Sequence, residues 1–171
     1  EERVRALEAK QDDTAKSLEV LKASLKAAAP SAVHAELKQK LEALEKQQAE
    51  AKAAAFYNLI RQKDYARVVE GYPDMQKEQL SKAETEFFRD TEERFRLELS
   101  VQAYQNGINM LGSGRYAEAA EALRESIRYK EEGAHTPAVK MQLAKALRSL
   151  GKAAEAQVLA AAVIEQNIDK E

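Results

Sequence analysis

Residues 114–120 read Gly-Arg-Tyr-Ala-Glu-Ala-Ala, and residues 151–157 read Gly-Lys-Ala-Ala-Glu-Ala-Gln. The second stretch begins 37 residues after the first, and Gly107 aligns with Ala144 at the same offset. Self-similarity at a period of roughly 20 to 50 residues is typical of proteins built from stacked copies of one small unit. The two stretches therefore predict a repeated structural element.

Each copy has the residues of two helices joined by a short turn. Gly114 and Gly151 suit the left-handed conformation that ends a helix, and we expect Tyr116 to pack at the turn. Ala119 and Ala156 are small, which lets two helices cross closely. Each copy is thus expected to be a helix, a turn and a second helix.

A weaker copy lies earlier, where residues 63–68 read Lys-Asp-Tyr-Ala-Arg-Val, 51 residues before the copy at 114–120. An extra stretch, residues 74–111, separates the two. It predicts one long helix or two nearly continuous helices, and Ser81 with Glu84 has the pattern of a capping box at its start. Its apolar stripe, which we expect in the core, comprises Leu80, Phe87, Phe88, Thr91, Phe95, Leu99 and Ala103.

Residues 1–52 predict a coiled-coil arm with a break at Pro30, whose ring ends one helix and suits the first turn of another. Apolar residues recur at alternating spacings of three and four on both sides of this break. The first seam is Val4, Leu7, Gln11, Thr14, Leu18, Leu21, Leu25 and Ala28, and the second is Leu37, Leu41, Leu44, Gln48, Ala51 and Ala55. The two helices can fold back as an antiparallel hairpin, or form one kinked arm that zips with other copies of the chain.

Composition favours helices and limits the classes of partner. The 171 residues include 27 basic and 29 acidic side chains, a net charge of −2 that gives no reason to expect a nucleic acid. Charged residues make up 33% and aromatic residues 6%, and cysteine is absent, which excludes disulfides and thiolate metal sites. The longest apolar run, from Val158 to Ile164, is far shorter than the roughly 20 residues that span a bilayer, so no membrane insertion is expected.

No catalytic or metal-binding constellation is visible in the sequence. His34 and His135 have no second ligand at the spacing of a known metal motif, and the stretch from Gly112 to Gly114 lacks the lysine of a phosphate loop. We therefore expect a protein that is not an enzyme and uses no cofactor or metal. The chain opens on Glu1 and its first methionine is Met75, so we expect a fragment of a longer protein or a mature form.

The repeated residues resemble the tetratricopeptide repeat. That family's pattern has a small residue within the first helix, as at Gly107 and Ala144, then Gly-x-Tyr at the turn, as at Gly114 and Tyr116, and alanine three residues later, as at Ala119. The resemblance implies an all-α fold of stacked helix pairs.

The resemblance also divides the chain. It covers residues 101–167 well and residues 53–72 weakly. We therefore expect an arm over residues 1–52, either a coiled coil or a helical hairpin, followed by a repeat domain over residues 53–171.

Tetratricopeptide repeats expose the first helix of each pair on a concave face that binds an extended or helical peptide, so the resemblance implies a protein–protein interaction adaptor or scaffold. The face would comprise Tyr57, Arg61, Tyr104, Ile108, Leu111, Met141, Lys145 and Arg148. The family's carboxylate clamp needs Lys and Asn where this chain has Tyr104 and Ile108, so we do not expect capture of a terminal carboxylate. The alternative is a structural spacer or oligomerisation module without a peptide groove, with residues 1–52 joining copies of the chain.

A coiled coil followed by such repeats also resembles the Tol–Pal-associated periplasmic proteins that coordinate cell division in bacteria. Those proteins oligomerise through the coiled coil. This second resemblance implies a bacterial protein of the periplasm or cell envelope, with the cytoplasm as the alternative location.

Overall fold

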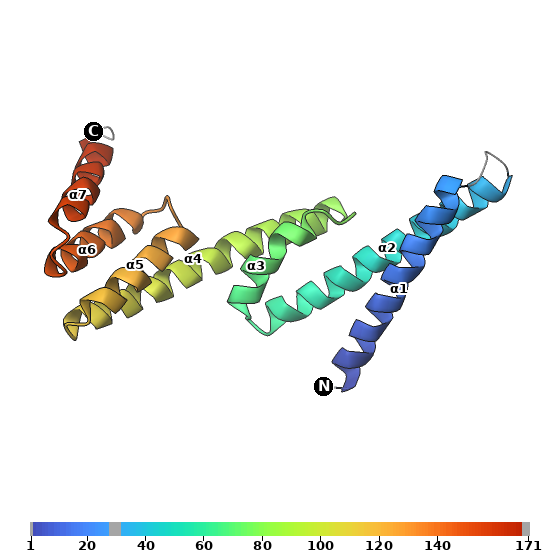
Figure 1. Ribbon diagram of the computed structural model, residues 1–171, viewed down its shortest axis with the longest axis horizontal. Helices are drawn as coiled ribbons and strands as arrows, with labels where there is room; N and C mark the ends of the chain where they lie inside the picture. Colours follow the sequence, from blue (N-terminus) through green and yellow to red (C-terminus); the bar gives the residue numbers. More distant parts are fainter. Residues whose placement is uncertain (1, 28–31, 169–171) are drawn as a thin grey trace. The chain divides into compact units, whose positions relative to one another are not determined.

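A chain rich in Ala, Leu, Glu, Lys and Arg has strong intrinsic preference for helix. The computed structural model describes residues 2–27 and 32–168, and these residues form α-helices and no strand (Figure 1). The helices are α1 (Glu2–Ala27), α2 (Ala32–Arg61), α3 (Tyr65–Met75), α4 (Lys82–Gly112), α5 (Tyr116–Tyr129), α6 (Thr136–Ser149) and α7 (Ala153–Ile168). The predicted all-α fold is confirmed, and the long helix expected within residues 74–111 is a single helix, α4, which begins at Lys82.

The chain forms two compact units, Glu1–Asp90 and Thr91–Glu171. The first contains α1, α2, α3 and the start of α4, and the second contains the rest of α4 with α5, α6 and α7. The boundary expected between residues 52 and 53 falls inside α2, which runs without interruption through both the arm and the first repeat copy.

In the first unit, α1 and α2 pack side by side as an antiparallel hairpin (Figure 1). The ammonium of Lys22 on α1 lies 3.5 Å from the carboxylate of Glu45 on α2, and this pair indicates the register of the two helices. That register places Leu18, four residues back on α1, level with Ala49, four residues on along α2, and both are buried. Within a single chain, α1 and α2 thus form a hairpin, and the alternative in which arms of different copies zip together stays a prediction. The break expected at Pro30 lies outside the described residues.

The three repeat copies share one turn, built from the same backbone hydrogen bonds. In each turn one backbone N–H donates to the carbonyl five residues earlier in the chain. The N–H of the residue just before that donor donates to the carbonyl three residues earlier than itself. The first set is Asp64 N–H to Leu59 C=O at 3.0 Å, Arg115 N–H to Met110 C=O at 2.9 Å and Lys152 N–H to Leu147 C=O at 2.9 Å. The second set is Lys63 to Ile60, Gly114 to Leu111 and Gly151 to Arg148. These positions are related by the offsets of 51 and 37 residues found in the sequence, so the copies are structural repeats.

Each turn needs one residue in the left-handed region. Gly114 has φ +73° and Gly151 has φ +78°, as predicted. Lys63 occupies the equivalent place with φ +54°, although its Cβ makes this conformation costly for any residue with a side chain. Tyr116, expected to pack at its turn, is 38% exposed instead, because it begins α5 on the solvent side.

Small residues bring α4 and α5 together in the second unit. A β-carbon built on Gly107 would lie 2.6 Å from Leu123 Cγ, so only glycine fits there without a shift. The core continues through α6 into α7, where Ala156 is buried. The buried core residues are Ala119, Ala120, Leu123, Val139, Leu143, Ala144, Ala146, Leu147 and Ala156.

The first unit has an aromatic core. The ring centroids of Phe56 and Phe88 lie 5.0 Å apart, nearly perpendicular, which is a favourable edge-to-face geometry. Gly71 on α3 lies under Phe56, where a β-carbon would be 3.4 Å from Phe56 Cε2. Phe88 is fully buried, but Phe87 is 43% exposed, so the predicted core stripe is wrong at this residue.

Two helix starts show what local sequence signals can do. At α4 the predicted capping box forms, with Glu84 N–H donating to Ser81 Oγ at 3.2 Å and Ser81 N–H donating to the Glu84 carboxylate at 3.0 Å. At α6, Thr136 followed by Pro137 has the sequence pattern of an N-cap with proline in the first helical turn, but this predicted cap does not form. His135 occupies the cap position, and the Thr136 hydroxyl donates to the Lys130 carbonyl at 3.1 Å instead.

Candidate protein-binding surface

Helix α6 turns one face to the core and the opposite face to solvent. Its buried face consists of Val139, Leu143, Ala144, Ala146 and Leu147. Met141, Lys145 and Arg148 are exposed, with Met141 at 46%, and their spacings of four and three residues place them on one side of the helix. We name these three residues the basic face of α6.

The basic face carries charge that its own unit does not neutralise. Helix α6 contains no Asp or Glu. Among the described residues, no carboxylate forms an ion pair with Lys145 or Arg148, whereas nearby Arg124 pairs with Glu121 at 2.9 Å and with Glu155 at 3.4 Å. Two exposed cations without an ion-pair partner among the described residues therefore lie about one helical turn apart on α6.

The α4 residues predicted for the same surface lie closer to the core. Tyr104 and Leu111 are half-buried and pack against the core that holds Ala144, and Ile108 is also half-buried. Ala144 lies on α6 between Met141 and Arg148. The α4 residues predicted for the surface thus belong to the edge of the core in the second unit, on the side of α6 that faces away from the basic face.

Tyr57 and Arg61, the other two residues predicted for the surface, belong to the first unit. Tyr57 is half-buried, and its ring centroid lies 5.4 Å from that of Phe87 and 4.8 Å from that of Phe88. Arg61 is exposed at the end of α2. Tyr57 therefore contributes to an aromatic cluster that is half open to solvent.

A groove of about 380 Å³ lies between α4 and α5 in the second unit. Its lining is Ala103, Asn106, Met110, Glu118, Glu121, Ala122, Glu125 and Arg128. The carboxylates of this lining have partners on the same helix or just before it. Arg115 hydrogen-bonds to Glu118 and holds the pKa of that carboxyl below its usual range. The groove is therefore polar and locally neutralised, unlike the basic face of α6.

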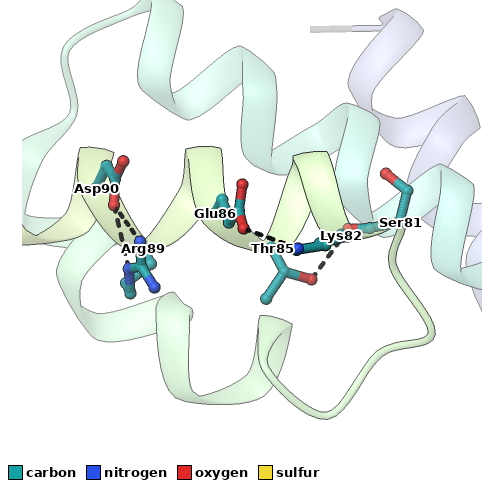
Figure 2. Close-up of polar contacts among 6 residues, drawn as sticks. All are labelled: Ser81, Lys82, Thr85, Glu86, Arg89 and Asp90. Carbon is teal, nitrogen blue, oxygen red and sulfur yellow. Dashed lines mark hydrogen bonds and ion pairs between the residues drawn. The ribbon is translucent and has the colours of Figure 1, made fainter.

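The first turns of α4 carry another polar surface (Figure 2). The Thr85 hydroxyl donates to the Ser81 carbonyl at 3.0 Å, Lys82 lies 3.9 Å from Glu86, and Arg89 pairs with Asp90 at 2.9 Å. These are exposed neighbours along one helix, and such pairs contribute little beyond solubility. Nothing in their arrangement converges on a ligand.

A buried polar cluster was missed by the sequence reasoning. Ser100 Oγ lies 2.8 Å from the Ser126 carbonyl, Ser126 Oγ lies 2.7 Å from the Ser100 carbonyl, and each hydroxyl donates to the other residue's backbone. His135 Nε2 lies 2.7 Å from Ser100 Oγ. Since the Ser100 proton is directed to Ser126, the Nε2–H tautomer of His135 donates to Ser100. The cluster ties α4, α5 and the start of α6 together.

The part of the chain that the structure describes shows neither a candidate metal site nor a candidate membrane span. In residues 2–27 and 32–168, no three His, Asp or Glu side chains are grouped so that they could hold a metal ion. None of the helices in this part of the chain is both long and apolar enough to cross a bilayer.

Comparisons with family models, with curated proteins and with solved structures found no match.

Proposed function

We propose that this chain is a non-enzymatic adaptor that binds another protein on the exposed face of its repeat helices. The observation that carries the proposal is the division of α6 into a closely packed core face and a basic face with an exposed methionine. Exposed Met and Arg side chains are common in protein interfaces, where Met adapts its shape and Arg forms several hydrogen bonds. A helix kept in place by its core face presents such side chains without further ordering.

The closest arrangement to a catalytic pair is the hydrogen bond between Ser100 and His135. Ser100 is 0% exposed, and its hydroxyl is engaged by the Ser126 carbonyl. A nucleophile must reach its substrate, so this pair supports a structural role. We therefore propose no reaction for the chain.

The finer proposal is that the repeats are of the tetratricopeptide kind, in a bacterial cell-envelope protein similar to the Tol–Pal-associated coordinators. The shared turn at the offsets of 51 and 37 residues supports a repeat protein. The Gly-x-Tyr turn and the close approach at Gly107 fit that family's pattern.

A photo-crosslinking amino acid at Met141 tests the adaptor proposal in cells that express the protein. We expect a covalent adduct with a different protein. The matched control carries the same amino acid at Gln157, an exposed position on α7 outside the basic face. No adduct at Met141, or adducts only with other copies of this chain, would contradict an adaptor.

A second candidate function, an oligomerisation module, is favoured by the arm. Five seam leucines whose burial the structure describes remain partly exposed in the hairpin: Leu21, Leu25, Leu37, Leu41 and Leu44. Partly exposed leucines gain free energy when another apolar surface covers them. Sedimentation of the full chain, with a Leu37→Glu and Leu44→Glu variant beside it, distinguishes the cases. A concentration-dependent oligomer that the variant loses supports self-association.

A further inference from the structure

We infer that the basic face of α6 binds an acidic segment of the partner protein, with Asp or Glu side chains at Lys145 and Arg148 and an apolar side chain at Met141. This inference rests on the proposed adaptor function and names the chemistry of the partner. The ligand groups are side-chain carboxylates along a chain, not a terminal carboxylate.

The charge of α6 favours an acidic partner. Helix α6 has three basic residues, Lys140, Lys145 and Arg148, and no acidic residue. The neighbouring helix α5 has basic and acidic residues that pair with one another, as Arg128 does with Glu125 at 3.7 Å. Neither Lys145 nor Arg148 has such a partner among the described residues. Both cations are therefore available to carboxylates of another molecule.

The spacing of the two cations on α6 also suits a pair of carboxylates. Lys145 and Arg148 are three residues apart on one helix face, so their Cβ atoms are roughly 5–6 Å apart. Two carboxylates one helical turn apart, or two residues apart in an extended strand, match this separation. The Arg148 guanidinium can accept a carboxylate with two parallel hydrogen bonds, and Lys145 acts as a point charge beside it.

The apolar component is the third argument. Met141 is 46% exposed, one turn before Lys145 on the same face. Its unbranched thioether adapts to different apolar side chains. An acidic segment with one leucine or phenylalanine can therefore place that side chain against Met141 and its carboxylates at Lys145 and Arg148.

Other anionic partners fit less well. Nucleic acids and anionic membranes are bound by many cations that release counterions from several phosphates or headgroups. The basic face offers two cations and a methionine, on a chain with a net charge of −2. A short acidic segment of protein needs only these.

Nuclear magnetic resonance titration of the full, isotope-labelled chain tests the inference. The probe is a short synthetic peptide with blocked ends that contains Glu and Asp around a central leucine. Its control replaces every Glu and Asp by Gln and Asn. We expect the acidic peptide to shift the amide resonances of residues 141–148 at low salt, with weaker binding as salt is added. We expect the uncharged peptide to bind at least about tenfold more weakly.

Charge reversal supplies the matched variants. Lys145→Glu with Arg148→Glu should weaken binding of the acidic peptide by about tenfold or more. Lys16→Glu with Lys38→Glu changes the net charge equally at two exposed positions of the arm and should leave binding unchanged. Circular dichroism checks that both variants keep their helices.

The outcomes separate this inference from the adaptor function. If both peptides bind the same face equally and charge reversal has no effect, the acidic-segment inference is overturned while the adaptor remains. If no peptide shifts residues 141–148, the inference also fails, and crosslinking at Met141 still tests the adaptor by itself. Stronger binding of this face to phosphatidylserine vesicles or to a single-stranded oligonucleotide would overturn it in favour of those partners.

Discussion

Gly107 on α4 lies so close to Leu123 on α5 that a β-carbon at position 107 would come within 2.6 Å of Leu123 Cγ and 2.8 Å of its Cδ2. Leu123 is fully buried, so it has little room to move away. A glycine in the interior of a helix weakens the helix by roughly 0.5–1 kcal/mol relative to alanine. This cost is accepted here because it permits the close crossing of the two helices.

Gly107→Ala is therefore expected to destabilise the second unit by about 1–2 kcal/mol, because overpacking costs more than the gain in helix propensity returns. Denaturant unfolding followed by circular dichroism measures the change. Gly112→Ala is the matched control on the same helix, since nothing lies within 4 Å of its would-be β-carbon. Equal effects of the two substitutions would contradict the close crossing.

Lys63→Gly is expected to stabilise the first unit by about 0.5–1 kcal/mol, because glycine adopts a positive φ without steric cost. The reverse change, Gly114→Ala at the equivalent turn, should destabilise the second unit by about 1 kcal/mol. The melting temperatures of the two variants check both signs. A destabilised Lys63→Gly variant would show that the lysine side chain makes a compensating contact.

Ser100→Ala is expected to cost more than Ser126→Ala, by about 1 kcal/mol. Loss of the Ser100 hydroxyl leaves His135 Nε2 without its acceptor and removes one of two donors to the Ser126 carbonyl, which keeps the Lys130 N–H. Loss of the Ser126 hydroxyl removes a donor to the Ser100 carbonyl and leaves the bond between Ser100 and His135 in place. Unfolding free energies of the two single variants and the double variant give the coupling between them. Additive effects would show that the two hydroxyls act independently.

Glu84→Ala should remove a pH-dependent contribution that the capping box at the start of α4 makes to the free energy of unfolding. Hydrogen bonds from the Ser81 side chain and backbone lower the pKa of Glu84 from 4.5. The folded state thus favours the ionised carboxylate, so its contribution is present above pH 4.5 and is lost as pH falls through the lowered pKa. The stability difference between wild type and variant, about 1 kcal/mol at neutral pH, should vanish in acid. Glu86→Ala, which removes only a distant ion pair with Lys82, should show almost no difference at any pH (Figure 2).

Cysteines at Lys22 and Glu45 report directly on the arm, because the chain has no cysteine of its own. In the hairpin these positions face each other across α1 and α2. A short bismaleimide crosslinker should therefore join them within one chain and leave a monomer on a denaturing gel. Crosslinked dimers as the main product would indicate that arms of different copies zip together.

Sequence reasoning could reach the helices and the repeat turns because both depend on local physics. Helical spacing identifies a helix wherever apolar residues recur, and a left-handed turn is visible wherever glycine is present, as at Gly114 and Gly151. The turn at Lys63 was harder to see, since its residue type disguises its conformation. Phe87 was assigned wrongly because two adjacent aromatic residues on a helix cannot both point to the same core.

The polar cluster lay beyond local reasoning. Ser100 is 26 residues from Ser126 and 35 from His135, and each of these residue types is ordinarily at the surface. Only the fold brings them together. The cap predicted at Thr136 failed for a similar reason, since the Lys130 carbonyl competes for its hydroxyl. For the candidate surface, the resemblance named Met141, Lys145 and Arg148, which are all exposed on α6, but neither the resemblance nor their spacing reveals a partner.

In the first repeat the first helix contributes the large residue to the helix crossing and the second helix contributes glycine, whereas in the second repeat the first helix contributes glycine and the second helix the large residue. Phe56 is the counterpart of Gly107 at the offset of 51 residues, and it lies over Gly71, whereas Gly107 lies under Leu123. A helix from one pair placed in the other would set Phe56 against Leu123. Repeat proteins are prone to misassembly during folding because their units resemble one another. In such a mismatched pair Phe56 would occupy space that only glycine fits beside Leu123. This clash disfavours the pairing of a helix with the wrong repeat during folding.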